Sequence, residues 1–284
     1  MKNPILNKRA SWLAKRTLVV IIAAIVLTSL GIKAGDNLLW TASLRGTTRQ
    51  DSPCPDNMVF ITSPDGGFCV DKYENSPGPG CPYQDPQNET ESQINLDSPN
   101  CLPVSKEIST PWRNVSQSQA ALACARAGKR LPSSKEWYQA ALDTPDKDSN
   151  WNEQDCQVKS NWPSQPGLTG SGKDCVSSAG AYDMIGNVWE WVDGTIFDGQ
   201  HEGHPLPEQG FVQGVDDEGL AYQTDLQEPA PNYNQDYFWI KQQGTRGIAR
   251  GGYWGNGSDA GVYSAYLVVP PSFSGTGVGF RCVK

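Results

Sequence analysis

Apolar residues come in short clusters separated by turn-forming residues over most of this chain, and the first two clusters are strand-like. They are Met58–Ile61 and Phe68–Tyr73, joined by Ser63-Pro-Asp-Gly-Gly67. β-Branched and aromatic residues bounded by Gly, Pro and Asp are typical of strands joined by a turn. The pattern therefore predicts two strands here. Residues 76–102, which follow, are rich in Pro, Asn, Asp and Gly and predict a loop.

Two helices are predicted next, each from a clear N-terminal signal. Ser116 and Gln119 have the spacing of a capping box, small residues follow on one face, and Gly128 is placed to end the helix. Ser133 and Glu136 repeat the capping box before a second apolar face. We expect the helices to begin directly after Ser116 and Ser133.

Regular patterns become rare after Thr144, where Gly, Pro, Asn, Ser and Trp are frequent. Residues 194–247 form a long acidic stretch with little periodicity, and such a length is more typical of a functional or stapled loop than of a second core. We find no internal repeat. The chain is predicted to hold one α+β domain, loop-rich and stapled by disulfides.

The N-terminus has a different pattern, because an uncharged apolar run, Thr17–Ile32, follows a basic tail. The run is slightly shorter than the ~20 residues that span a bilayer, and its basic flank places the N-terminus in the cytoplasm and the remainder outside. We expect a cytoplasmic tail and signal anchor in residues 1–34, a stalk in 35–53 and the folded domain in 54–284. A cleaved signal peptide with its site near Ala34 is the alternative.

Charge also divides the chain. Asp and Glu number 31 against 23 Lys and Arg, a formal net charge of −8. Six of the basic residues precede the first acid, Asp36, so the remainder carries −14. Such a surface repels nucleic acid and offers it no basic stripe. Nucleic acid is therefore excluded as a partner.

Eight cysteines all lie beyond the apolar run. An even number in an exported domain indicates disulfides, and the absence of Cys-x-x-Cys argues against a zinc or redox site. Proximity in the sequence suggests the pairs Cys54–Cys69, Cys81–Cys101 and Cys156–Cys175. His201 and His204 have a spacing that could bind a metal, but the surrounding Gly and Pro favour a solvated loop.

The C-terminal residues 250–284 combine a rigid frame with positions that look exchangeable. The frame consists of glycines, Trp254, Ala260, Leu267, Pro271 and the closing residues 279–282. Aromatic, small and aliphatic residues stand between the frame positions. A catalytic centre needs one defined set of polar groups, whereas this pattern is closer to that of an antibody's binding surface.

Four motifs occur in a specific order along the chain. They are Gly128-Lys-Arg-Leu-Pro-Ser133, Tyr182-Asp-Met-Ile-Gly-Asn-Val-Trp-Glu-Trp191, Arg250-Gly-Gly-Tyr-Trp254 and Gly279-Phe-Arg-Cys282. Together they resemble the formylglycine-generating enzyme (sulfatase-modifying factor) superfamily, which has a variant of the C-type lectin fold. One fold hosts many functions, so the resemblance speaks for the fold more than for an activity.

Within that superfamily, the segment from Trp254 to Val262 and the Pro-Ser-x-Ser-x-Thr pattern from Pro271 resemble the variable proteins of diversity-generating retroelements. In those systems template adenines are randomised as a repeat is copied into the 3′ end of the gene. The resemblance implies a variable ligand-binding face on a membrane-anchored surface protein, with a protein or surface ligand as partner. The expected ligand-binding residues are Tyr253, Gly255, Asn256, Asp259, Tyr266, Val268, Val269, Phe273, Gly275 and Gly277.

The superfamily resemblance carries two further implications. Positions matching Asp183, Gly186, Val188 and Glu190 bind structural calcium in the enzymes, and carboxylate and carbonyl oxygens are suitable calcium ligands. A salt bridge or turn cap is the alternative role for the two carboxylates, and Trp189 and Trp191 are expected in the core. The resemblance also implies a Cys124–Cys282 disulfide.

Two rival functions are weighed against a binding protein. The enzymes carry a reactive cysteine pair in the C-terminal segment, whereas residues 251–281 contain no cysteine. Without a thiolate the chain lacks both the soft copper ligand and the nucleophile, so we expect no catalytic cofactor and no enzyme activity. An invariant structural surface protein is the other alternative.

Overall fold

The two predicted strands form and pair with each other. β1 (Met58–Ile61) lies antiparallel to β2 (Phe68–Asp71), which ends slightly earlier than predicted. The computed structural model describes residues 53–63, 66–159 and 161–284. The predicted N-terminal tail, the apolar run and all but the last residue of the stalk lie outside these ranges. Within them, no helix is long and apolar enough to cross a membrane.

A helix occupies part of the region predicted as a loop, so that prediction is wrong. α2 (Glu89–Asp97) begins after Asn88, whose side chain accepts a hydrogen bond from the Glu91 N–H at 3.0 Å. Polar contacts hold the helix in place. Asn95 Nδ2 donates to the Tyr83 carbonyl at 2.8 Å, for example. An apolar face, the signal on which the sequence prediction relied, is therefore absent.

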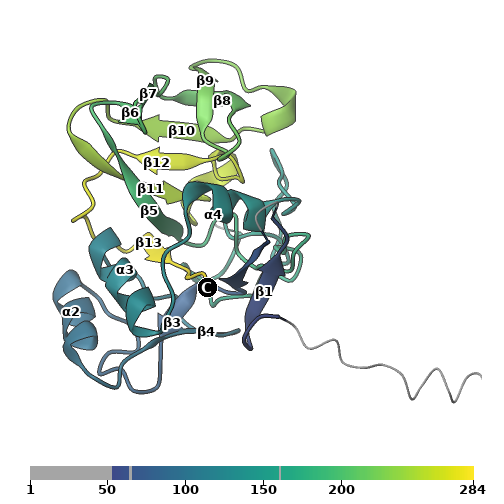
Figure 1. Cartoon of the computed structure of the whole chain (residues 1–284). Coiled ribbons are helices and arrows are strands. Elements are labelled where there is room, and N and C mark those ends of the chain that lie inside the picture. The colour runs from purple at the N-terminus through teal and green to yellow at the C-terminus, as the bar shows by residue number, and fades with distance from the viewer. Residues whose placement is uncertain (1–52, 64–65, 160) are drawn as a thin grey trace, which may run out of the picture. The chain divides into compact units, whose positions relative to one another are not determined.

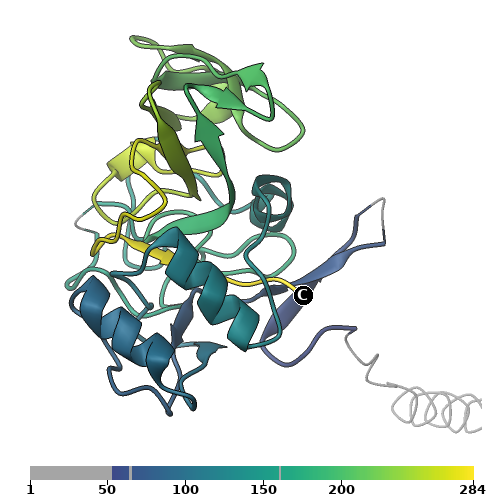
Figure 2. The same ribbon diagram turned by 60° about the vertical axis from the view of Figure 1, so that its left-hand side comes forward.

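Both capped helices form as predicted. α3 (Gln117–Arg126) and α4 (Ser134–Ala141) begin after Ser116 and Ser133, and each has a complete capping box. Gly128, two residues beyond α3, adopts a φ of +68°, as expected for a residue that ends a helix. Figure 2 shows α2 and α3 side by side on one flank of the molecule.

The main sheet of the described chain has nine strands, in the order β7-β6-β5-β11-β12-β10-β8-β9, with β13 beside β5 (Figure 1). β10–β12 and β5–β13 are parallel pairs, and the other pairs are antiparallel. A separate pair is formed by β3 (Asn75–Pro77) and β4 (Pro103–Ser105). The strands of the main sheet are β5 (Trp189–Phe197), β6 (Gln200–His201), β7 (His204–Pro205), β8 (Gly210–Val215), β9 (Ala221–Asp225), β10 (Tyr237–Ile240), β11 (Thr245–Arg250), β12 (Ala265–Leu267) and β13 (Val278–Phe280).

The long loop predicted for residues 194–247 is also wrong. This stretch supplies β6 to β10 and a short 3-10 helix, η1 (Pro231–Tyr233). Val212, Leu220 and Phe238 from this stretch are buried. Each strand is too short, and too closely bounded by turns, to show a clear period of two in the sequence. The acidic residues lie largely in the turns between the strands, and their number favoured the prediction of a loop over that of strands.

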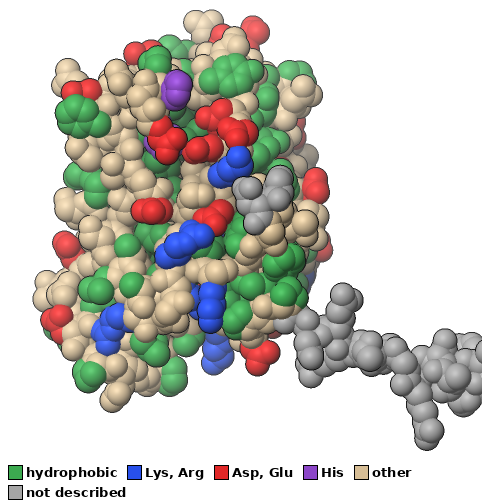
Figure 3. Space-filling model, in the orientation of Figure 1, with side chains coloured by type: hydrophobic (Ala, Val, Ile, Leu, Met, Phe, Trp, Pro, Cys, Tyr) green, Lys and Arg blue, Asp and Glu red, His purple; other side chains and the backbone are tan. Residues whose placement is uncertain are grey.

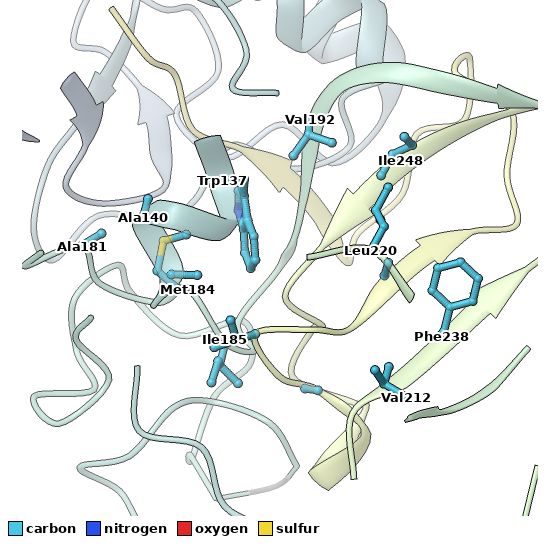
Figure 4. Close-up of a cluster of buried hydrophobic side chains, with 14 of the residues drawn as sticks. Trp137, Ala140, Ala181, Met184, Ile185, Val192, Val212, Leu220, Phe238 and Ile248 are labelled. Atoms are coloured by element: carbon cyan, nitrogen blue, oxygen red, sulfur yellow. The ribbon is translucent and has the colours of Figure 1, made fainter. Parts of the chain in front are cut away.

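Two buried clusters hold the elements together. In the larger one, Trp137 of α4 lies on the side toward Val192 of the sheet, while Ala140 lies beside Ala181 and Met184 (Figure 4). The smaller cluster joins α3 to the sheet through the tryptophan, phenylalanine and cysteine side chains around Phe280. The predicted α+β class is confirmed, with the sheet as its larger part.

All four predicted disulfides are present. Cys124 of α3 bonds to Cys282, which lies two residues beyond the end of β13. The pairs Cys54–Cys69, Cys81–Cys101 and Cys156–Cys175 close shorter loops. No cysteine is free in the part of the chain that the structure describes. The C-terminal end is thus tied covalently to a helix formed 158 residues earlier.

Candidate functional site

The C-terminal segment leaves β11 through a turn that requires glycine. Gly251 and Gly252 each have a φ of +89°, a conformation that glycine adopts readily. A Cβ on Gly251 would lie 2.7 Å from the Met184 carbonyl oxygen, and one on Gly252 would lie 2.3 Å from the Ala260 Cβ. This close approach fixes the path on which the following residues are presented.

A cavity of about 370 Å³ lies between this segment and the strands beside it. The sheet contributes tryptophans and small residues, and the segment contributes the rest. From the sheet the lining residues are Trp189, Trp191, Trp239, Ala249 and Val278, and from the segment they are Tyr253, Asn256, Tyr266, Val269, Phe273, Gly275, Thr276 and Gly277. Seven of the ten residues expected to bind ligand therefore line one cavity.

Aromatic rings in contact form much of the cavity wall. Trp189 stacks on Tyr266 with ring centroids 5.6 Å apart and meets Trp239 edge-on at 5.5 Å. The ring centroid of Tyr237 lies 4.8 Å from that of Trp239, and Tyr237 extends the aromatic cluster along β10. None of the lining side chains is charged. Aromatic faces with a few neutral polar groups suit the apolar or aromatic part of a ligand better than a desolvated charge.

The rim of the cavity is partly polar and partly exposed. Asn256 Oδ1 accepts a hydrogen bond from the Tyr253 N–H at 2.9 Å, which holds the two residues together. Burial, and to a lesser extent Tyr253, raise the pKa of Tyr266. Phe273 is 40% exposed. These side chains can contact a ligand without leaving their positions.

Three of the expected ligand residues do not line the cavity. Gly255 is exposed, whereas Val268 and Asp259 are half-buried. Burial raises the pKa of Asp259, and nearby Lys159 opposes the shift. These residues belong to the same segment but lie outside the hollow itself.

Trp239 was not predicted as a site residue. It lies on β10, inside the stretch assigned to a loop, and its side chain meets Trp189 at the cavity. The sequence Tyr237-Phe-Trp-Ile240 alternates between half-buried and buried residues. The run of three aromatic residues and a β-branched residue, which is typical of a strand, was the available signal in the sequence.

Trp254 differs from its expected place in the buried frame. It is only half-buried, and its ring lies 5.0 Å from that of Tyr253. Its backbone N–H donates to the Asn187 carbonyl at 3.1 Å. Among the apolar frame residues, Ala260 and Leu267 are fully buried. Trp254 therefore belongs to the edge of the exposed face rather than to the core.

A buried ion pair supports the strand that carries Trp189. Arg281 donates to Glu190 through Nε and Nη2, at 2.6 and 2.5 Å, and both side chains are almost fully buried. Trp137 Nε1 donates to the same carboxylate at 2.7 Å, and Arg281 reaches the Tyr182 carbonyl at 2.8 Å. Because neighbouring side chains on a strand point to opposite faces, this network fixes β5 from the side opposite to the cavity.

The four residues expected at a calcium site are unequally suited to it. Both oxygens of Glu190 are already occupied by Arg281 and Trp137. Asp183 Oδ2 accepts from the Gly170 N–H at 2.6 Å, while Oδ1 is buried without a hydrogen bond. Burial raises the pKa of Asp183 to about 7. Asp183 thus has an oxygen available to a cation, whereas Glu190 would have to share its oxygens.

Within the described ranges, no three or more acidic, histidine or cysteine side chains are grouped to hold a metal ion. Gly186 and Val188 could contribute only carbonyl oxygens to a calcium ion. Calcium at Asp183, Gly186, Val188 and Glu190 therefore stays a prediction.

The two histidines lie in a small hairpin rather than in an irregular loop. His201 of β6 is opposite His204 of β7. His201 Nδ1 is 3.9 Å from Glu218 Oε2, and further acids lie close to Glu218. Figure 3 shows acidic side chains gathered near a histidine on this face of the molecule. The arrangement is that of a solvated acidic surface.

Several solved structures are similar to the chain. The Major Tropism Determinant I1 Variant is 17% identical with a TM-score of 0.44, over 82% of this chain and 53% of that one, so the chain spans about half its length. Treponema denticola variable protein 1 is 16% identical with a TM-score of 0.39, over 81% of this chain and 99% of that one. PvdO from Pseudomonas aeruginosa is 15% identical with a TM-score of 0.40, over 80% and 90% of the two chains.

No curated protein sequence matches the chain. Residues 69–284 match the sulfatase-modifying factor enzyme 1-like domain, the FGE-sulfatase family. The match covers well over half of the chain and includes every motif quoted above. The chain therefore belongs to the FGE-sulfatase family.

Proposed function

We propose that this chain is a binding protein without enzyme activity, whose residues 250–284 present an exchangeable ligand-binding face. The observation that carries the proposal is the cavity, because seven of the ten positions singled out as variable or displayed line it together. Frame residues such as Leu267 and Phe280 are fully buried. Binding contacts and folding contacts thus fall on different residues of the same segment.

The glycines of the face support exchange. A Cβ on Gly255 or Gly277 would meet ring atoms of Tyr253, at 2.7 and 2.9 Å, and one on Gly275 would meet the Phe273 ring at 2.8 Å. At Gly255 and Gly275 these atoms are at the far ends of the rings, whereas at Gly277 they are on one edge of the Tyr253 ring, which would have to turn as a whole. A new side chain at any of the three glycines would therefore reshape the cavity without moving the backbone.

The cysteines argue against formylglycine-type oxidation. That chemistry needs a thiolate as nucleophile and as soft metal ligand, and all eight cysteines of this chain are in disulfides. Cys282 is the one cysteine of the C-terminal segment, and it is fully buried and bonded to Cys124. The segment therefore has no thiol to react.

We further propose that the domain is displayed on a cell surface by residues 1–34. The support is the apolar run Thr17–Ile32 behind its basic flank, together with disulfides that suit an oxidising compartment. The partner would be a protein or another surface ligand that meets the face formed by residues 250–284.

Comparison of the gene among cells of one population tests the variable face. We expect substitutions concentrated at the ten face positions, an imperfect adenine-rich repeat of the 3′ end, and a reverse transcriptase gene nearby. Codons for the frame residues serve as the internal control and should be unchanged. A 3′ end that is invariant and lacks such a repeat would leave an invariant structural surface protein as the better interpretation.

A direct assay tests the absence of oxidase activity. The full chain, supplied with copper, is incubated with a sulfatase-motif cysteine peptide, and the aldehyde product is sought by mass spectrometry. We expect no conversion above that of a heat-inactivated sample. Turnover above this control would contradict the proposal.

A further inference from the structure

Two aspartates outside the cavity are buried against each other. Asp236 precedes β10 and is fully buried, and Asp146 lies in the loop after α4. Asp146 as a whole is half-buried, but both of its carboxylate oxygens are inaccessible to solvent, as is Oδ1 of Asp236. These three oxygens have no hydrogen-bond partner of ordinary geometry, although the N–H groups of Lys147 and Val262 lie near enough to the Asp146 carboxyl to oppose the rise of its pKa. The Asp146 carboxyl faces Asp236 and the side chain of Asn234.

The surroundings do not neutralise this pair. The positive charge of Arg250 lowers the pKa of Asp236. However, the Arg250 guanidinium donates its hydrogen bonds to Ser134 Oγ at 2.5 Å and to backbone carbonyls, including that of Gly219 at 2.8 Å. Two carboxylates in contact cannot both stay ionised in a buried site unless a positive charge compensates them. Burial raises the pKa of Asp146 to about 6 and that of Asp236 well above its usual range.

The backbone of the C-terminal segment packs closely against Asp236. A Cβ on Gly261 would lie only 1.8 Å from Asp236 Oδ1, so that glycine is required for the approach. The other oxygen, Asp236 Oδ2, accepts a hydrogen bond from the Tyr263 N–H at 2.7 Å. One oxygen of Asp236 is thus used to hold the C-terminal segment, while the second is directed at Asp146 and kept free of side chains.

We propose that Asp146 and Asp236 bind a divalent cation of the calcium class. The available atoms are carboxylate oxygens, which calcium prefers. A cation here replaces the missing positive charge and gives the three unbonded oxygens a partner. The site is separate from the predicted one around Asp183, and it does not depend on the proposed ligand-binding function.

The position of the cation gives it a structural role. It joins the loop after α4, the loop before β10 and the residues Gly261–Tyr263 of the C-terminal segment. Ser258 Oγ, in the same segment, donates to the Asp148 carbonyl at 2.6 Å, which is a second link to the first of these loops. Calcium therefore stiffens the base from which the ligand-binding face is presented.

Thermal unfolding of the full chain in calcium chloride, against EDTA with KCl at the same ionic strength, tests the site. We expect calcium at about 100 times its Kd to raise the Tm by roughly 5 °C. An Asp146→Asn, Asp236→Asn double variant should lose this gain. In EDTA it should be at least as stable as the original chain, because the repulsion between the carboxylates is removed. Asp143→Asn, at an exposed aspartate of the same loop, is the matched control and should retain the gain.

The outcomes that overturn the proposal are equally definite. They are the absence of any calcium gain in the original chain, a gain in the double variant as large as in the original chain, and a gain that Asp143→Asn abolishes. If circular dichroism shows that the double variant is not folded, calorimetric titration of the Asp146→Asn variant with calcium decides instead. An at least tenfold loss of calcium affinity supports the site, and an unchanged affinity overturns it.

Discussion

The glycines of the C-terminal segment fall into two groups with different surroundings. At Gly251 and Gly252 the backbone has a positive φ, and a side chain would strike backbone or buried atoms. Gly255, Gly275 and Gly277 do not have a positive φ, and a side chain there would first meet ring atoms of Tyr253 or Phe273. The first group is needed by the fold, and the second is needed only for the present shape of the cavity.

This difference shows how one short segment can carry both folding and recognition. Its backbone is fixed by turns, by the pairing of β12 and β13 with the sheet, and by the buried Cys124–Cys282 disulfide. Its exchangeable side chains contact mainly one another and the rings of Trp189 and Trp239. Altering the face therefore should not alter the frame, and the following variants test this separation.

The largest expected effect is at Arg281. Arg281→Met should lower the free energy of unfolding by about 3–5 kcal/mol, because it leaves the buried Glu190 carboxylate without its partner. Urea denaturation of the full chain measures the loss. Lys284→Met, at an exposed position in the same terminal stretch, is the control and should be nearly neutral. A loss below about 1 kcal/mol at Arg281 would mean that the frame does not depend on this pair.

Two phenylalanines seven positions apart offer a matched pair. Phe280 is fully buried and packs against Trp112 at 6.0 Å, so Phe280→Ala should cost about 3–5 kcal/mol. Phe273 is 40% exposed, and Phe273→Ala should cost less than about 1 kcal/mol. Thermal melts under identical conditions compare them. Equal losses would remove the distinction between frame and face.

The glycine comparison can be tested with single methyl groups. Gly252→Ala should destabilise the chain by about 2–4 kcal/mol, through its positive φ and the contact with Ala260. Gly277→Ala should cost less than about 1 kcal/mol, because the Tyr253 ring can turn aside. Urea midpoints give both values. A Gly277 variant as unstable as the Gly252 variant would show that the face is not free to change.

Trp254 and Tyr266 should give intermediate losses, because both lie at the boundary between frame and face. Each is half-buried, and each stacks on or meets a neighbouring ring. We expect Trp254→Ala and Tyr266→Asn to cost about 1–2 kcal/mol, between the two Phe variants. Differential scanning calorimetry can resolve such differences. A loss of stability at Trp254 as large as that at Phe280 would show that the Trp254 side chain is needed by the fold.

The sequence predicted those features that depend on neighbouring residues. Ser116 and Ser133 announce their helices because a cap and its partner are three positions apart. The alternation of frame and exchangeable residues likewise gave most of the cavity lining. α2 escaped prediction because Asn95 and other polar groups, rather than an apolar stripe, hold it.

Other parts of the site depend on contacts between distant residues. Trp239 reaches the cavity only because β10 pairs with β12 in parallel, and no local pattern indicates that pairing. Glu190 and Arg281 are 91 positions apart, so the sequence could suggest a metal ligand for Glu190 but could not reveal its cationic partner. Exposure was equally hard to predict, since Trp254 looks like a core residue until its neighbours are in place.

The last strand, β13, is encoded after every exchangeable position of the chain. An insertion or deletion of one nucleotide while the face is being rewritten would replace Gly279-Phe-Arg-Cys282 by unrelated residues. Such a chain would lose a sheet strand, the partner of Glu190 and the disulfide to Cys124 together. If the face is exchanged as proposed, completing the fold acts as a check on the reading frame, because only genes that keep their frame to the end yield a folded domain.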